Sequence, residues 1–185
     1  MNPRENLSQA FAAAMNEARI APRTTWPWLT LAGMALLADQ LSKALVASSL
    51  MLGERIPLTN FFNLVYVLNP GAAFSFLADA GGWQRYAFSV LGIAVSVWMT
   101  REILQGKARR MECLAYAMII GGALGNVVDR VLRGAVTDFL DFHWQGMHWP
   151  AFNFADIAIN IGVLAMLLSI WGQSRSEHAR HEVSA

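Results

Sequence analysis

Four stretches of this chain are long and apolar enough to cross a lipid bilayer as helices, and they restrict its fold more than any other feature. A helix needs about 20 apolar residues to cross the hydrocarbon core, and backbone polar groups at that depth must be paired internally. With 55% hydrophobic and 15% charged residues, the composition is typical of a membrane protein. The expected spans are residues 26–48, 83–100, 112–132 and 151–171.

The segment between the first two expected spans has a different character. Residues 49–81 contain Gly53, Pro57 and Pro70, together with a β-prone run at residues 61–68. These interruptions exclude another span and favour a small β unit on the membrane surface. We therefore expect one domain over residues 1–185, mainly α and integral to the membrane. It would have four transmembrane helices and a small β-structured segment on the outer membrane surface between the first and second helices.

Basic residues indicate how the chain is oriented in the membrane. Lys and Arg are enriched in cytoplasmic connections, and nine of the 14 lie in the two tails and in the connection between the second and third spans. Both tails, residues 1–25 and 172–185, are therefore expected in the cytoplasm. Residues 49–81 and 133–150 then face the periplasm, and we expect residues 133–150 to form a loop. The nine residues are Arg4, Arg19, Arg23, Arg101, Lys107, Arg109, Arg110, Arg175 and Arg180.

Charged and amide side chains gather towards the periplasmic ends of the expected spans. Asp39 and Lys43 lie four residues apart, acid first, which is the better order for a helical ion pair. Charged groups at membrane depth are costly, so they usually mark a functional site. One face of the third span carries Asn126, Asp129, Arg130 and Arg133. The groups that fall towards the periplasm are Asp39, Asn69, Asp129, Arg130, Asp138 and Asp156.

Asp138 and Asp156 are the candidate catalytic residues on chemical grounds. Two carboxylates near a dry surface can share one proton, so that one acts as a base while the other remains an acid. The ionised group deprotonates a water molecule and the protonated group polarises a carbonyl, which together hydrolyse a peptide bond. Asp156 comes near the start of the last span, where the helix dipole favours a charged carboxylate. This chemistry needs neither a metal nor a cofactor, and we expect neither.

The sequence lacks the motifs that other kinds of catalytic or binding site require. The chain has no GxSxG and no HExxH motif, and no Gly-rich loop has phosphate-binding spacing. His143 and His148 are five residues apart without an acidic residue between them, so interfacial packing is favoured over a metal site. The single cysteine, Cys113, excludes an intramolecular disulfide and a cysteine metal cluster. A net charge of +1 gives no basic face for nucleic acid.

Structural roles are the alternative for several of these polar groups. Asn69 precedes Pro70 and Gly71 and can simply make a turn. Asp141, so near Asp138, is expected to be a solvated loop acid. Asn126, Asn153 and Asn160 can act as hydrogen-bond links between helices. Buried pairs that set helix register are the alternative for Asp39 with Lys43 and for Asp129 with Arg130 or Arg133. A transporter or channel is the alternative function, but the inner halves of the spans carry essentially no charge.

Five sequence blocks match one known family in order and cover nearly the whole chain between the tails. They are DQLSK at 39–43, NPGAAF at 69–74, GGALGNVVDR at 121–130, VTDF at 136–139 and FNFAD at 152–156. Together they are highly specific, although each alone is weak. The chain resembles lipoprotein signal peptidase, the bacterial type II signal peptidase family.

The resemblance implies a multi-pass aspartic endopeptidase of the bacterial inner membrane with its active site facing the periplasm. Such an enzyme removes signal peptides from diacylglyceryl-modified prolipoproteins by cutting just before the lipid-bearing cysteine. The implied partners are these prolipoproteins and membrane lipid, with globomycin-type cyclic peptides as inhibitors. No nucleic acid partner is implied, and a monomer is expected. Residues 49–81 would contain the family's small extracytoplasmic β-cradle between the first and second helices, and residues 133–150 would form a flap over the cleft.

The resemblance also carries residue roles over to this chain. It implies that Asp138 and Asp156, from VTDF and FNFAD, are the catalytic pair. The residues that would support the site or contact the substrate are Asn69, Asn126, Arg130 and Asn153. The residues that would have structural roles are Asp39, Lys43, Asp129 and Gly71.

Overall fold

The computed structural model describes residues 25–71 and 81–184, with side chains up to residue 174. Almost all of the expected N-terminal tail lies outside the described residues, as do Ala72, Ala73 and Phe74 of the NPGAAF block. The described part of the chain forms four long helices, each of which is long and apolar enough to cross a membrane. They are α2 (Trp26–Ser49), α3 (Gln84–Leu104), α4 (Arg110–Arg133) and α5 (Phe154–Ser184). The expected fold class, mainly helical with four candidate membrane helices and a small antiparallel sheet, is confirmed.

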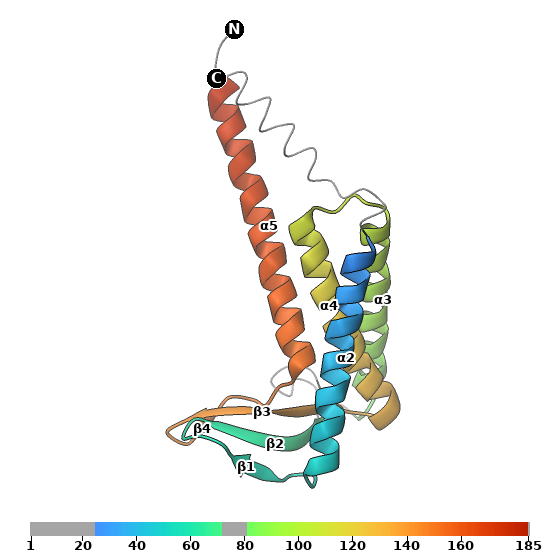
Figure 1. Ribbon diagram of the computed structural model, residues 1–185, viewed down its shortest axis with the longest axis vertical. Helices are drawn as coiled ribbons and strands as arrows, with labels where there is room; N and C mark the ends of the chain where they lie inside the picture. Colours follow the sequence, from blue (N-terminus) through green and yellow to red (C-terminus); the bar gives the residue numbers. More distant parts are fainter. Residues whose placement is uncertain (1–24, 72–80, 185) are drawn as a thin grey trace.

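Helix α4 lies at the centre of the bundle and packs against α2, α3 and α5 (Figure 1). Glycines let the neighbouring backbones come close, as small residues do in membrane bundles. A Cβ added to Gly121 would lie 2.6 Å from the backbone oxygen of Ala32 in α2, and one on Gly122 would overlap the carbonyl of Ala155 in α5. These glycines of α4 therefore determine how closely α2 and α5 pack against it.

Helix α5 is longer than expected. The helix continues to Ser184, where the sequence predicted a tail from residue 172. No proline and no further glycine follows Gly172, so nothing in the sequence stops the helix there.

A four-stranded antiparallel sheet lies across one end of the helices and extends sideways beyond the N-terminal end of α5 (Figure 1). Its strands, in spatial order, are β1 (Arg55–Pro57), β2 (Phe62–Asn69), β3 (Val136–Trp144) and β4 (Met147–His148). Pairing between β2 and β3 sets Val67 opposite Asp138 and Asn69 opposite Val136. The sheet thus joins the two connections that the sequence assigned to the periplasm.

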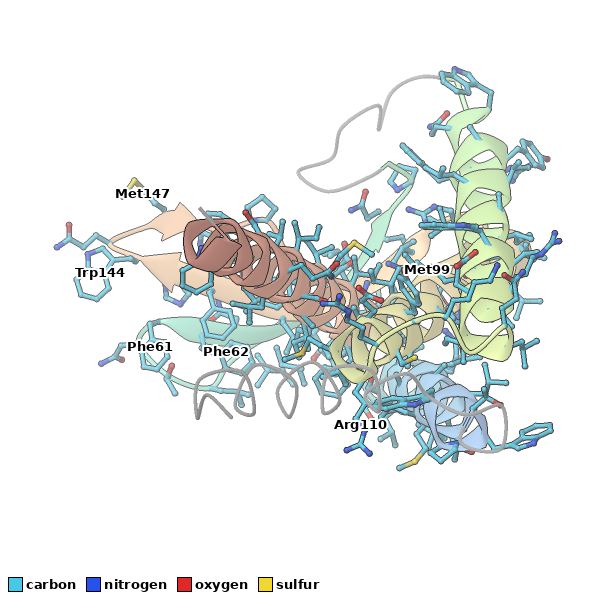
Figure 2. All side chains as sticks on the ribbon, turned by 90° about the horizontal axis from the view of Figure 1, so that it is seen from above. Phe61, Phe62, Met99, Arg110, Trp144 and Met147 are labelled. Carbon is cyan, nitrogen blue, oxygen red and sulfur yellow. The ribbon has the colours of Figure 1, made fainter. Side chains whose placement is uncertain are left out.

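The prediction of a loop at residues 133–150 is wrong, because most of this segment is β3 and β4. Apart from Asp138 and Asp141, β3 is rich in β-prone residues such as Val136, Thr137 and Phe139, and β2 offers it a pairing edge. Gln145 and Gly146 make the tight turn to β4, both with positive φ (49° and 82°), as two-residue hairpin turns require. Trp144 and Met147 flank this turn and point away from the helices (Figure 2).

Candidate active site

Asp138 is held in β3 by two amide groups. The side chain of Asn69, at the end of β2, donates to its Oδ2 at 3.1 Å, and that of Asn153 donates to its Oδ1 at 2.6 Å. The side chain is 2% exposed. Burial, together with the charge of nearby Asp156, raises the pKa of Asp138 to about 7, against the opposing effect of both hydrogen bonds.

Asp156 is held by the start of α5. Asn153 immediately precedes the helix, and its side-chain oxygen accepts the backbone N–H of Asp156 at 3.0 Å. In return, Oδ2 of Asp156 accepts the backbone N–H of Asn153 at 3.2 Å, so the FNFAD block forms a reciprocal helix cap. The other carboxylate oxygen, Oδ1, accepts the side-chain N–H of Asn126 in α4 at 2.9 Å.

Asn126 and Asn153 link the two carboxylates. Asn153 donates to Asp138 and to Oδ1 of Asn126 (3.4 Å), while Asn126 donates to Asp156. Two acids that are eighteen residues apart and lie on a strand and a helix therefore belong to one hydrogen-bonded network. Asn126 and Asn153 therefore link separate elements by hydrogen bonds, and they form these links at the two carboxylates.

Lys43 anchors that network from α2. Its ammonium lies 2.9 Å from Oδ2 of Asp39, 3.3 Å from Oδ2 of Asp129 and 3.0 Å from Oδ1 of Asn126. The Lys43, Asp39 and Asp129 side chains are all fully buried. The expected Asp39–Lys43 pair is present, and it extends to an acid of α4 that sequence spacing did not connect to it. Lys43 also fixes which end of the Asn126 amide points to Asp156.

The two acids beside Lys43 hold the backbone next to each candidate catalytic residue. Oδ1 of Asp39 accepts the N–H of Ala155 at 2.8 Å, one residue before Asp156. Oδ2 of Asp129 accepts the N–H of Thr137 at 2.9 Å, one residue before Asp138. The buried cluster therefore positions both carboxylates through their own main chain.

Asp129 also pairs with Arg133 one turn along α4, while Arg130 points elsewhere. The guanidinium of Arg130 donates to the carbonyl of Gly71 at 3.0 Å and to that of Asn126 at 3.3 Å, and it lies 5.3 Å from the ring centroid of Phe88. Its buried Nε has no hydrogen-bond partner among the described residues. Arg130 thus has one N–H donor that none of the described residues uses.

Asn69 both makes a turn with Gly71 and contacts a candidate catalytic residue, the two roles that the sequence left open. The backbone N–H of Gly71 donates to Oδ1 of Asn69 at 3.0 Å, which closes a local turn. The other end of the same amide donates to Asp138. The turn therefore fixes the amide that contacts the carboxylate.

A cavity of about 790 Å³ opens at the two aspartates and runs along the helices. Its polar end is lined by Asn69, Asn126, Arg130, Asp138 and Asp156. Its deeper walls are mostly apolar and come from Phe88, Leu91, Gly92 and Val95 of α3, Ile119 and Ala123 of α4, and Ile157 and Ile161 of α5. A carboxylate pair at the mouth of an apolar channel suits hydrolysis of a substrate with a long apolar part.

Asp141 is not the solvated loop acid that the sequence predicted. It is 3% exposed on β3 and accepts hydrogen bonds from Asn63 at 2.8 Å and His148 at 2.8 Å, with Arg55 at 3.6 Å. Burial acts to raise its pKa, but the bonds from Asn63 and His148 and the nearby positive charges outweigh it and lower the pKa. Asp141 therefore ties together β1, β2, β3 and β4 and stands apart from the candidate pair Asp138 and Asp156.

The two histidines of this sheet pack against each other. His143 and His148 stack with ring centroids 5.0 Å apart across the β3–β4 pair. Among the described residues, no group of three or more His, Cys, Asp or Glu side chains is arranged to hold a metal ion.

Sequence reasoning missed Gln40, which belongs to the buried cluster. Its side-chain amide donates to Oδ2 of Asp39 and to the backbone oxygen of Gly125, both at 3.1 Å. A Cβ on Gly125 would overlap the Asp39 carboxylate, so this glycine makes room for the acid. The available signal was the position of Gln40 beside Asp39 in the DQLSK block.

Sequence comparisons with known proteins agree on one family. The family model described as signal peptidase (SPase) II matches residues 31–172. The lipoprotein signal peptidase of Azoarcus sp. (strain BH72) is 51% identical over 150 residues, which cover 81% of this chain and 84% of that protein. That of Ralstonia nicotianae is 49% identical over 142 residues, covering 77% of this chain and 82% of the relative. A bacterial membrane enzyme solved by the in meso method at 2.3 Å matches with a TM-score of 0.71 and 26% identity, covering 80% of this chain and 89% of that one.

Proposed function

Because the chain belongs to the signal peptidase II family, we propose that it is an aspartic endopeptidase with Asp138 and Asp156 as the catalytic pair. Its substrate is a prolipoprotein whose cysteine carries a diacylglyceryl group, and it cuts just before that cysteine. The observation that carries the proposal is the linking of the two carboxylates by Asn126 and Asn153 at the polar end of an apolar cavity.

The two aspartates divide acid and base roles in this mechanism. The raised pKa of Asp138, about 7, lets it carry the shared proton near neutral pH. Asp156 accepts one N–H on each carboxylate oxygen at the N-terminus of α5, and these donors and the helix dipole favour its charged form. Asp156 removes a proton from a water molecule, and the oxygen of that water attacks the carbon of the scissile carbonyl. The carbonyl oxygen accepts a hydrogen bond from protonated Asp138. The proton taken by Asp156 then passes to the leaving nitrogen as the C–N bond breaks.

Arg130 supports substrate binding in this proposal. Its guanidinium lines the cavity beside both aspartates, and its Nε–H has no partner among the described residues. A charged donor in such a setting makes a stronger hydrogen bond to a peptide carbonyl than a neutral one does. Arg130 therefore holds a backbone carbonyl next to the scissile bond.

The membrane fixes where the cut occurs. The aspartates lie at the end of the helices that carries the sheet (Figure 1), which the distribution of basic residues assigns to the periplasmic side of the inner membrane. A scissile bond there lies near the lipid headgroups, while the apolar part of the cavity accepts the apolar parts of the substrate. Globomycin-type cyclic peptides would inhibit by occupying this cavity.

The test compares one prolipoprotein with and without its diacylglyceryl group, both in bilayer nanodiscs with the purified protein. A buried acyl chain contributes about 0.8 kcal/mol per methylene relative to water, but both substrates are already in lipid, so the net gain is smaller. The lipid acts mainly by fixing the depth and orientation of the scissile bond. We expect the lipidated form to be cleaved much faster. Equal cleavage of the two forms would point to a general intramembrane peptidase instead.

A further inference from the structure

Asn160 is an exposed polar side chain that lines the cavity and that the catalytic mechanism does not use. It lines the cavity one helical turn below Asp156, towards the interior of the membrane. Four residues along a helix correspond to about 6 Å. Other residues that line the same cavity, such as Leu91, Ala123 and Ile157, are apolar.

The hydrogen bond that Asn160 makes leaves half of its amide available. Its Nδ2 donates to the backbone oxygen of Asp156 at 2.8 Å, which fixes nitrogen and oxygen of the amide without ambiguity. Among the described residues, no donor lies on its Oδ1, and the second N–H of Nδ2 has no acceptor. Asn160 thus presents one acceptor and one donor to the cavity. Polar groups at membrane depth are costly without partners, so this arrangement points to a ligand that supplies both.

The substrate has a matching pair of groups at this depth, if the proposed function holds. A signal peptide enters from the membrane, so the residues before the scissile bond run from the aspartates into the cavity. They must be extended to present a peptide bond to two carboxylates, and an extended peptide in an apolar channel leaves N–H and C=O groups unpaired. Since an extended chain advances about 3.3 Å per residue, a point about 6 Å from Asp156 lies two residues before the cut.

We propose that Asn160 is a substrate-binding residue that hydrogen-bonds the signal-peptide backbone about two residues before the scissile bond. Its Oδ1 accepts the peptide N–H and its second N–H donates to the peptide C=O. The ester groups of the diacylglyceryl lipid fit less well, because they supply acceptors and leave Oδ1 unsatisfied. This inference rests on the proposed function and adds a determinant of how the signal peptide is registered in the site.

The test combines a side-chain change with a backbone change. Lipidated substrates are made in which the amide at one, two or three residues before the cut is replaced by an ester, which removes its N–H. The enzymes are the wild type, Asn160→Leu, and Val163→Leu as a control on an exposed face of α5 outside the cavity. The Leu variant is expected to fold, because the Asn160 side chain bonds within its own helix alone. Values of kcat/KM are measured in nanodiscs.

We expect the wild type and Val163→Leu to lose about three- to ten-fold in kcat/KM on the ester nearest Asn160, the range for hydrogen bonds inside membranes. Asn160→Leu should lose a similar factor on the natural substrate and lose nothing further on that ester. Equal ester sensitivity of Asn160→Leu and wild type at all three positions would overturn the inference. So would a loss in Asn160→Leu that disappears when the substrate lacks its lipid, which would assign the side chain to the diacylglyceryl group. Failure of the wild type to cleave the natural substrate would instead reject the proposed function.

Discussion

Replacing Asp39 with Asn tests how far the buried cluster supports the site. Asn has the same shape, and its remaining oxygen can still accept the N–H of Ala155, now 2.8 Å from Oδ1. The other position, however, becomes an NH2 group that faces the ammonium of Lys43 and the amide of Gln40, both donors. Lys43 loses its nearer carboxylate partner and keeps Asp129 at 3.3 Å.

The size of the effect follows from burial. Removing one partner of a buried ion pair costs about 3–5 kcal/mol, because the other charge stays desolvated. Since Lys43 retains one carboxylate, we expect the lower end, about 3 kcal/mol. For a chain of this size that corresponds to a fall in Tm of roughly 6–12 °C.

The assay is thermal unfolding in detergent, together with turnover measured well below the Tm of the variant. Ser42→Ala is the matched control in the same helix, since the Ser42 hydroxyl makes one bond to the backbone oxygen of Asp39 at 2.7 Å. It should cost no more than about 1 kcal/mol. Asp39→Asn should unfold earlier and retain measurable turnover while folded. An unchanged Tm with a collapse of turnover would refute the reasoning and place Asp39 in the chemistry.

Two further predictions concern pH and helix contact. Because the pKa of Asp138 is raised to about 7, kcat/KM should fall as the pH rises above about 7. The same shift means that Asp138 binds its proton more tightly in the folded state than in the unfolded state. Its contribution to folding stability is therefore full below about pH 4 and is lost as the pH rises through 7. A Tm that does not fall between pH 5 and pH 8 would contradict this. Gly122→Ala should lower the Tm by several degrees, because its Cβ would overlap the carbonyl of Ala155, and overpacking costs about 1–3 kcal/mol. Gly33→Ala, with nothing within 4 Å of the added Cβ, is the control, and equal melting of the two variants would argue against close contact between α4 and α5.

The helices and several contacts within them could be predicted from sequence because their signals are local. Runs of apolar residues define the spans, and the spacing of Asp39 and Lys43 predicts their pair, which forms at 2.9 Å. The glycines at 121 and 125 likewise predict close packing, and both approach α2.

Contacts between distant segments could not be predicted in the same way. The reach of Lys43 to Asp129 and Asn126 joins α2 to α4, and no spacing rule covers such a contact. Strand β3 was missed because its β-prone residues are interrupted by Asp138 and Asp141, which look like loop acids. Its pairing with β2 supplies what the local sequence lacks. Asp141 is buried for the same reason, since partners on other strands surround it.

The catalytic pair is the central claim, and cleavage by Asp138→Asn and Asp156→Asn tests it most directly. The purified variants are given a diacylglyceryl-modified prolipoprotein in nanodiscs, in buffer containing EDTA, and release of the signal peptide is measured. Asp141→Asn is the control, because it removes a buried carboxylate from the same strand as Asp138 outside the cavity. We expect the wild type and Asp141→Asn to cleave and both catalytic variants to be inactive while still folded. Near-normal turnover by either catalytic variant, or loss of wild-type activity in EDTA, would contradict the assignment.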